Sequence, residues 1–255
     1  MTDALFLAEL DGAAPGGRVA VTGDEGRHAA VVKRITPGES VLLADGRGKA
    51  VRGPVVEVDK RGIVVEVAEC LTSPERPHRW VGVQALAKGD RSDLAVETMT
   101  ELGVDEVVAW QASRSIVRWS GDKATKGLAK WQATAREASK QSRRFRVPQL
   151  ATASTRQLCE RIAAADLALV LHEAAATELA GVELPEHGEV LFVVGPEGGI
   201  SPEELDAFQT AGARPVLVSD AVLRTSTAGV VALAQLQLMA QQAAGSHDPG
   251  QGERG

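Results

Sequence analysis

A glycine-rich loop in the last third of the chain has the composition of a ligand-binding loop. It spans residues 195–199, Gly-Pro-Glu-Gly-Gly, and directly follows the apolar run of residues 190–194. Glycines let backbone N–H and C=O groups approach a ligand closely, and Ser201 and Glu204 have the spacing of a capping box that would start the next helix. A tight turn from strand to helix would use the same residues. The loop contains neither the dinucleotide-binding glycine pattern nor a P-loop.

A second polar segment stands where the last apolar helix pattern begins. Thr225, Ser226 and Thr227 form a run of hydroxyl residues next to Arg224, which has no evident acidic partner in the sequence. Any one of the hydroxyls could be the helix N-cap, but a cap needs only one of them. A polar helix N-terminus with a cation beside it favours an anion or another ligand. We therefore predict a binding site here.

Cations gather in the middle of a chain whose formal net charge is −6. Between residues 130 and 146 they stand against one carboxylate, Glu137, with Phe145 among the arginines. Such clustering indicates a phosphate-binding surface, on which Phe145 could stack a base. A solvated helix face explains the same charges equally well. The cluster comprises Lys130, Arg136, Lys140, Arg143, Arg144 and Arg146.

Other polar residues narrow the chemistry mainly by exclusion. Lys88 and Arg91 follow the first strand expected after residue 79, where a substrate loop would lie, although capping and surface charge also account for them. His172 lacks the partners of a metal site and the two cysteines are far apart, so no bound metal is expected. No GxSxG motif is present, which argues against a serine hydrolase of that type.

The elements that must position these residues follow two patterns. Up to about residue 70 the sequence has short strand signals, a hairpin turn at residues 59–62 with Gly62 available for positive φ, and a short helix over residues 28–34 capped by Asp24. Residues 73–78 hold two prolines among polar residues and are predicted to form a linker. The strand signals fall at residues 6–10, 18–22, 41–44, 55–59 and 63–67.

After residue 79 strand signals alternate with helix signals. Continuous apolar runs are typical of parallel strands that are buried on both faces. The order predicts an α/β domain with a mainly parallel sheet, which binds ligands at the carboxyl ends of its strands. The predicted helices run from Asp90 or Ser92 to Gly103, over residues 122–142 and over residues 227–242. The predicted strands are residues 80–86, 105–110, 167–171, 190–194 and 215–218.

The overall composition fits a globular protein. Hydrophobic residues make up 44% of the chain and charged residues 24%, so a sizeable core is expected. Aromatic residues reach only 3%, which predicts a core of Ala, Val and Leu. The sequence shows no signal peptide and no apolar run long enough to span a membrane, so a cytoplasmic protein is expected. Residues 245–255 form a polar, glycine-rich tail that is expected to fray.

Several sequence blocks, in their order and spacing, resemble one known family. VVGPEGGISPEE, followed by VLRTSTA and an apolar helix, resembles the SPOUT superfamily of knotted methyltransferases. GRHAAVVKRITPGESVLLADGRG, TELGVDEVVAW, SRSIVRW, REASKQSRRFRVP and LVLHE are similar to blocks of the bacterial small-subunit rRNA uridine-N3 methyltransferases. The resemblance covers nearly the whole chain. It departs at Ser226, where that family commonly has an acidic residue, and at Val218-Ser219, where it usually has Leu-Gly.

The resemblance implies an α/β protein with a PUA-like β-barrel over residues 1–73. It also implies a SPOUT methyltransferase domain over residues 79–243 that contains a deep C-terminal trefoil knot. A homodimer and a bound S-adenosylmethionine, held by the loops of the knot, are implied as well. The cofactor-binding positions so implied are Leu171, His172, Gly195, Pro196, Glu197, Gly199, Ile200, Ser219, Val222, Leu223, Thr225, Ser226, Thr227 and Ala228.

For the reaction, the resemblance implies methylation of N3 of a uridine in 16S rRNA within the 30S subunit. Arg224 would stabilise the anionic ring, Lys88 or Arg91 would be the next candidates, and Glu101 is a candidate base. The alternatives are 2′-O-ribose methylation by the same fold and a non-catalytic RNA-binding factor in ribosome assembly. The RNA-binding residues expected are His28, Lys33, Arg34, Arg114, Lys140, Gln141, Arg143 and Arg144.

Overall fold

The computed structural model describes residues 3–245, and the chain in it forms two compact units. The first unit comprises the chain up to Glu75 together with Ala135–Val147. The second comprises Arg76–Thr134 together with the chain from Pro148 onward. Helix α3 (Asp122–Gln141) therefore contributes residues to both units. Most of the tail expected at residues 245–255 lies outside the described residues, and residue 245 is the last of helix α6.

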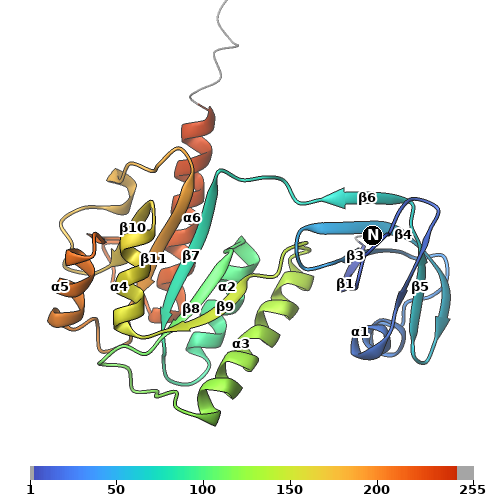
Figure 1. Cartoon of the computed structure of the whole chain (residues 1–255), viewed down its shortest axis with the longest axis horizontal. Coiled ribbons are helices and arrows are strands. Elements are labelled where there is room, and N and C mark those ends of the chain that lie inside the picture. Colours follow the sequence, from blue (N-terminus) through green and yellow to red (C-terminus); the bar gives the residue numbers. More distant parts are fainter. Residues whose placement is uncertain (1–2, 246–255) are drawn as a thin grey trace, which may run out of the picture. The chain divides into compact units, whose positions relative to one another are not determined.

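The first unit is built on a six-stranded sheet (Figure 1). The order is β1-β3-β4-β5-β2, with β6 paired to β4, and only the β1–β3 pair is parallel. The buried faces of these strands form a core that includes Phe6, Val41, Leu43 and Val65. The strands are β1 (Ala4–Leu7), β2 (Arg18–Val21), β3 (Ser40–Ala44), β4 (Lys49–Asp59), β5 (Gly62–Glu66) and β6 (Glu69–Thr72).

Strand β4 is twice as long as the signal at residues 55–59 predicted. Its first half pairs with β3 and β6 and its second half with β5. Gly53 and Pro54 weaken the strand signal in the sequence of the first half, because both residues are unusual inside strands. The hairpin at residues 59–62 is present, but Gly62 does not adopt positive φ. A glycine is required at this position because there is no room for a side chain: a Cβ would lie 2.0 Å from the carbonyl oxygen of Val21.

The helical segment of the first unit begins earlier than predicted. Helix α1 (Gly23–Arg27) follows Thr22, so Asp24 lies in the first turn and is not the cap. The chain continues as a π-helical turn, η1 (His28–Val32), and Arg34 then takes a left-handed backbone with φ 55°.

The second unit has a sheet of six parallel strands in the order β12-β10-β11-β7-β8-β9 (Figure 1). The five predicted strands are present with ends shifted by at most a few residues, whereas β9 was not predicted. The continuous apolar runs are buried on both faces, as expected for parallel strands. The strands are β7 (His78–Ala85), β8 (Glu106–Trp110), β9 (Gln149–Ala153), β10 (Leu167–Leu171), β11 (Gly188–Val194) and β12 (Arg214–Val216).

Helices connect these strands. Asp90 stands at the cap position of α2 without a side-chain cap bond, and the hydroxyl of Ser92 instead accepts a hydrogen bond from the Ala87 N–H. No described helix is long and apolar enough to cross a bilayer. Besides α3 the unit contains α2 (Arg91–Leu102), α4 (Thr155–Ala164), the 3-10 helix η2 (Leu179–Gly181), α5 (Pro202–Thr210) and α6 (Thr225–Gly245).

The core of the second unit is mostly Ala, Val and Leu, as the composition predicted. The few aromatic residues nevertheless supply its largest buried side chains, among them Trp110, Phe192 and Phe208. Trp110 and Phe208 meet edge to face, with ring centroids 5.2 Å apart. Each such ring buries a large apolar area, so the scarce aromatics have a large share in packing.

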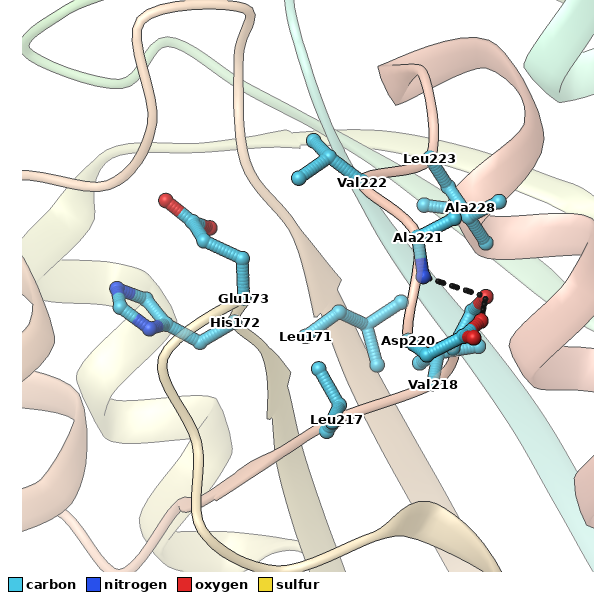
Figure 2. Close-up of a pocket in the computed structure, with 11 residues that line it drawn as sticks. Leu171, His172, Glu173, Leu217, Val218, Asp220, Ala221, Val222, Leu223 and Ala228 are labelled. Carbon is cyan, nitrogen blue, oxygen red and sulfur yellow. Dashed lines mark hydrogen bonds between the residues drawn. The ribbon is translucent and has the colours of Figure 1, made fainter.

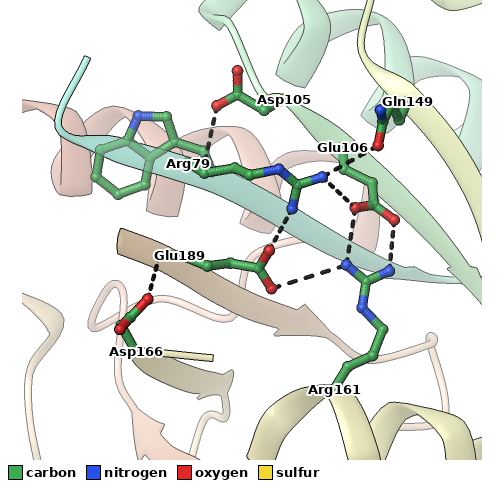
Figure 3. Close-up of polar contacts among 8 residues, drawn as sticks. Arg79, Asp105, Glu106, Gln149, Arg161, Asp166 and Glu189 are labelled. Atoms are coloured by element: carbon green, nitrogen blue, oxygen red, sulfur yellow. Dashed lines mark hydrogen bonds and ion pairs between the residues drawn. The ribbon is translucent and has the colours of Figure 1, made fainter. Parts of the chain in front are cut away.

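Charged side chains join the amino-terminal ends of three strands (Figure 3). Glu106 begins β8 and accepts two hydrogen bonds from Arg161 of α4 and one from Arg79 of β7. Arg79 also pairs with Glu189 of β11. Burial alone would raise the pKa of Glu106, but the hydrogen bonds and charges of the two arginines together outweigh it, so this pKa lies below its ordinary value. These ion pairs link β7, β8, β11 and α4 at the amino edge of the sheet.

The carboxyl ends of the six parallel strands share the opposite edge. From β7 the chain passes to β8 and β9 on one side, whereas β11, β10 and β12 lie on the other. Strands β7 and β11 therefore flank the point where the winding reverses, which is where open parallel sheets bind ligands.

Candidate functional site

Loops that follow β10, β11 and β12 enclose a cavity of about 290 Å³ at the carboxyl edge. A second cavity of about 110 Å³ adjoins it between the loops after β10 and β12. Figure 2 shows this second cavity, with Leu171 between a loop that carries His172 and Glu173 and a loop that carries Val222. The larger cavity is lined by Arg91, Leu171, His172, Glu173, Val194, Gly195, Pro196, Glu197, Gly199, Ile200, Val222, Leu223, Arg224, Thr225 and Ala228.

The glycine-rich loop after β11 owes its shape to its sequence. Gly199 has φ 70°, a left-handed backbone that side chains disfavour. A Cβ at Gly195 would lie 2.9 Å from the Ile200 side chain, so that position must stay bare. The predicted capping box is present: the Ser201 side chain accepts the Glu204 N–H, and the Glu204 carboxylate accepts the Ser201 N–H. The loop is thus fixed at both ends.

Thr225 joins this loop to the first turn of α6. Its hydroxyl donates to the carbonyl oxygen of Gly195 at 2.8 Å and accepts from the amide nitrogen of Gln84 at 3.0 Å. Thr225 and Gln84 are both buried. The Thr225 hydroxyl thus links the start of α6 to the glycine-rich loop and to strand β7.

Two of the predicted cofactor positions do not line the cavities. Ser226 is 4% exposed and faces the protein interior. The hydroxyl of Thr227 donates to the carbonyl oxygen of Arg224 in its own turn. Both side chains point away from the cavities that Thr225 and Ala228 line, because successive residues of a helix point in different directions. The other twelve predicted positions border the cavities, including Ser219, which lines the smaller one.

The predicted catalytic cations are arranged unequally. Arg224 is exposed at the mouth of the larger cavity, and its guanidinium makes no hydrogen bond or ion pair with any residue that the structure describes. Arg91 also lines the cavity and lies 3.4 Å from Glu197. Lys88 uses its backbone N–H, which donates to the same carboxylate oxygen of Glu197 at 3.1 Å. Arg224 is therefore the cation most available to a ligand.

Glu101 does not line either cavity. It lies near the far end of α2, which starts at the carboxyl edge with Arg91 and runs back along the sheet. Ten helical residues span about 15 Å, so Glu101 stands about that far along the helix from Arg91, and its role as a base stays a prediction. The prediction rested on the charge of Glu101 alone.

Glu173 and Asp220 line the cavities although they were not predicted as site residues. Both stand in the loops that follow predicted strands, and that position was the available signal. The Nδ1 of His172 accepts the Ala174 N–H at 3.2 Å, so this ring atom is occupied within its own loop.

The RNA-binding positions predicted in the first unit differ in exposure. Lys33, Arg34, Gln141 and Arg143 are exposed, whereas His28 and Arg144 are half-buried. Arg143 has φ 54° and, like Arg34, a left-handed backbone. Of the described residues that are not glycine, only these two arginines have positive φ, and such strain concentrates at functional positions.

Lys140 is engaged inside the first unit. Its side chain is 7% exposed, and its ammonium lies 3.0 Å from Glu25 and 2.7 Å from Glu137. A buried ammonium between two carboxylates has no free face for a phosphate, so direct contact with RNA is wrong for this residue. Lys140 instead ties α3 to α1.

The part of the chain that the structure describes contains no cluster of His, Cys, Asp or Glu able to hold a metal ion. The cavities have the size of small-molecule sites. Backbone groups of three loops, the carboxylates of Glu173, Glu197 and Asp220, and the guanidinium of Arg224, unpaired among the described residues, line them. Such an arrangement can bind a polar, partly apolar ligand and stabilise negative charge beside it.

Two family models match the sequence. One, an RNA methyltransferase domain, matches residues 74–237, and the other, an RNA methyltransferase PUA domain, matches residues 21–68. The matches confirm a PUA-like sheet followed by a parallel α/β methyltransferase domain.

Curated relatives and solved structures agree with these models. The ribosomal RNA small subunit methyltransferase E of Mycobacterium tuberculosis is 46% identical over 224 residues, which are 85% of each chain. Its counterpart in Bacillus subtilis is 28% identical over 85% of this chain and 88% of the relative. A structure of the Neisseria gonorrhoeae methyltransferase E, bound to S-adenosyl methionine, matches with a TM-score of 0.82 and 27% identity over 93% of this chain and 98% of that chain. The chain therefore belongs to the ribosomal RNA small subunit methyltransferase E family, as its sequence blocks indicated.

Proposed function

We propose that the protein transfers a methyl group from S-adenosylmethionine to N3 of a uridine in 16S rRNA. One observation carries the proposal. Three loops at the carboxyl edge of the second unit converge on a cavity, and at its mouth stands Arg224, a cation without a partner among the described residues. Membership of the family supplies the reaction type and the RNA class, and the resemblance of the sequence blocks supplies uridine N3.

The cofactor would occupy the two adjoining cavities. Apolar groups of Leu171, Val222 and Leu223 would contact the adenine, and backbone groups of the glycine-rich loop would bind its polar edges. Both cavities belong to loops of the last three strands, the region in which the resemblance implies a deep trefoil knot. We include that knot in the proposal.

For the chemistry, bound S-adenosylmethionine supplies a methyl group on a sulfonium, which is already a strong electrophile. The residues of the chain then have to orient the uracil and handle its N3 proton. Arg224 would stabilise the negative charge on the ring once N3 has lost its proton. Glu173 and Glu197 line the larger cavity, and one of these carboxylates would accept that proton.

The exposed cations of the first unit would bind RNA phosphates. Lys33, Arg34 and Arg143 are the candidates there, and Arg114 is the candidate in the second unit. Since each phosphate contact releases counterions, binding should weaken steeply as salt rises. Enzymes that act on ribosomal RNA must meet their substrate where ribosomal subunits are made, so we place the protein in the cytoplasm.

We propose that the protein forms a homodimer. Helix α6 packs on α2, and Leu94, Val222 and Leu238 remain exposed on or beside these helices. A second copy of the chain would cover such apolar groups at low cost. Light scattering of the purified protein and of Leu238→Glu tests the dimer: the variant should shift to half the mass.

Methyl transfer from labelled S-adenosylmethionine to 30S subunits that lack this methylation tests the proposed reaction. Nucleoside analysis of the digested RNA should find 3-methyluridine. A label on a ribose would keep the fold and replace the reaction by 2′-O-methylation. Calorimetry that detects no S-adenosylmethionine binding would replace the enzyme by a non-catalytic RNA-binding factor.

A further inference from the structure

The loop of residues 111–119 follows β8 and stands beside the glycine-rich loop in the second unit. Its sequence, Gln-Ala-Ser-Arg-Ser-Ile-Val-Arg-Trp, contains two arginines and no carboxylate. Exposure alternates along it: Arg114, Ile116 and Arg118 are exposed, whereas the residues between them are buried or half-buried. The outer side of this loop thus carries an apolar side chain between two cations.

The side chain of Ile116 is 69% exposed. It is held in this exposed position by hydrogen bonds within the loop. A single exposed apolar residue is by itself ordinary on a protein surface. This loop, however, is closed by a hydrogen bond of 2.6 Å from the Trp119 N–H to the Gln111 side chain. The guanidinium of Arg118 closes it further by donating to the carbonyl oxygen of Ser113 at 2.8 Å.

A buried carboxylate anchors the first half of the loop. Glu204 is 7% exposed and accepts the N–H of Ser113 at 2.7 Å and its hydroxyl at 2.8 Å. The same carboxylate accepts the Ser201 N–H at 3.3 Å and the Thr155 hydroxyl at 3.4 Å. Glu204 therefore fixes the loop of residues 111–119 to the glycine-rich loop that lines the cavity.

Aromatic packing anchors the second half. Trp119 meets the buried Trp131 of α3 edge to face, with ring centroids 5.2 Å apart. Gly127 of the same helix makes room for it, because a Cβ there would lie 2.5 Å from the indole. A loop with anchors at both ends presents its outer side chains in one arrangement.

Arg114 reaches the rim of the site. Its guanidinium donates to the carbonyl oxygen of Gly198 at 3.3 Å, and a Cβ at Gly198 would lie 3.3 Å from the Arg114 Cβ. Arg114 and the glycine-rich loop also line a further cavity of about 480 Å³, together with His172, Glu173 and Glu197. The basic face of the loop is thus next to the cavity in which the reaction is proposed.

We propose that the loop of residues 111–119 is a preformed RNA-binding surface, and this inference rests on the proposed function. Arg114 and Arg118 bind phosphates on either side of the target uridine, and Ile116 packs against an unstacked base beside it. Positive charge without any carboxylate in the loop favours RNA over a protein partner. A base that leaves its stack exposes apolar surface, which an apolar side chain can cover. Glu204 acts as a positioning residue, since it touches neither RNA nor cofactor.

The affinity of the protein for 16S rRNA transcribed in vitro, measured at several salt concentrations, tests the surface. Ile116→Ala should weaken RNA affinity about three- to tenfold, near the lower end of what contact with one base contributes, whereas Ile116→Leu should retain it. Arg114→Ala and Arg118→Ala should each reduce the slope of log K against log salt by about 0.7. Arg156→Ala, at an exposed arginine of α4 that pairs with Glu160, is the matched control and should leave the slope unchanged.

Glu204→Gln tests the positioning role, because the amide can accept only at one atom where the carboxylate accepts at two. It should raise the KM for 30S subunits about tenfold and leave kcat within about twofold.

Cofactor binding by calorimetry separates the two proposals. If the unchanged protein methylates 30S subunits but RNA affinity is the same in Ile116→Ala and the arginine variants, this inference is overturned and the proposed function stands. A change of oligomeric state in Ile116→Ala would also overturn it and assign the loop to a second copy of the chain. Failure of the unchanged protein to bind S-adenosylmethionine would reject the proposed function itself.

Discussion

The two edges of the parallel sheet in the second unit use charged residues in opposite ways. At the amino edge each of two arginines, Arg79 and Arg161, pairs with both Glu106 and Glu189 (Figure 3). At the carboxyl edge Arg224 has no partner among the described residues and faces a cavity. Paired charges hold strands together, whereas an unpaired charge at a cavity is free to bind a ligand. One sheet thus keeps stability and binding at separate places.

This separation is a physical consequence of the parallel arrangement. All six strands end at one edge, so the loops that follow them meet there and can enclose a ligand. The other edge receives the chain from helices and can be closed by side chains alone. Substitutions at the two edges should therefore affect different measured quantities.

Loss of Arg224, at the carboxyl edge, should have the largest effect on methyl transfer. Arg224→Ala removes the cation proposed to stabilise the uracil anion, and kcat should fall about 100- to 1,000-fold, as when one oxyanion donor is lost. The free energy of unfolding should change by less than about 0.5 kcal/mol, because an exposed side chain without partners is removed. Single-turnover methyl transfer and chemical denaturation measure the two quantities.

Arg224→Lys is the matched control, since it keeps the charge and loses the planar fork. It should retain more activity than Arg224→Ala. Equal rates for Arg224→Ala and the unchanged protein would show that the open cation has no part in the reaction.

Loss of Glu106, at the amino edge, should have the opposite result: the protein should lose stability and keep its activity. Glu106→Gln removes the carboxylate that pairs with both Arg79 and Arg161 and leaves them only Glu189, which should reduce the free energy of unfolding by about 2–4 kcal/mol once their partial exposure to solvent is allowed for. The melting temperature should fall by roughly 5–10 °C. At low temperature, kcat should stay within about twofold of the original value, because the cavity lies at the other edge.

Glu160→Gln provides the comparison for this variant. Glu160 pairs with Arg156 on the exposed side of α4, and both side chains are more than half exposed. The loss should stay below about 0.5 kcal/mol. Equal losses for the two glutamine variants would contradict a special role of the amino edge.

Acid should reduce the stabilisation that the ion pairs of Glu106 give to the amino edge. The pKa of Glu106 is lowered in the folded protein, so on acidification the unfolded chain binds the proton first. The stabilisation is complete above the ordinary glutamate pKa of about 4.3 and is lost as the pH falls through the lower folded pKa. Unfolding measured between about pH 6 and pH 3 should show a smaller pH dependence for Glu106→Gln than for the unchanged protein. Parallel curves would mean that Glu106 has the same pKa in both states.

The sequence predicted those features that depend on neighbouring residues. The apolar runs of β10 and β11, the glycine-rich loop and the hydroxyl run at the start of α6 were all predicted, because local composition determines them. Strand β9 was missed because it is an edge strand with mixed exposure, and α4 was missed although Ser154 and Gln157 form a capping box. A search for capping boxes would have found that helix.

The sequence was a weaker guide to the site where tertiary structure decides. Glu101 and Lys140 were chosen for their charge, and only the direction of α2 and the burial of the Lys140 ammonium show that Glu101 does not line the cavities and that Lys140 has no free face for a phosphate. Glu173 and Asp220 reach the cavities because separate loops converge. The pairing of Arg79 with Glu106 and Glu189 joins three strands that are distant in sequence, and no local pattern indicates it.

A substitution at Thr225 should have the smallest effect and test how the carboxyl edge is held together. Thr225→Val removes the donor to the Gly195 carbonyl oxygen and one acceptor of Gln84. One hydrogen bond contributes about 1 kcal/mol, so the Kd for S-adenosylmethionine should rise about three- to tenfold. Thr227→Val is the control, because the Thr227 hydroxyl donates only within its own turn, and it should leave cofactor affinity unchanged. If Thr225→Val lowered the melting temperature as much as Glu106→Gln, the carboxyl edge would also be stabilising the fold, and the division of roles between the two edges would not hold.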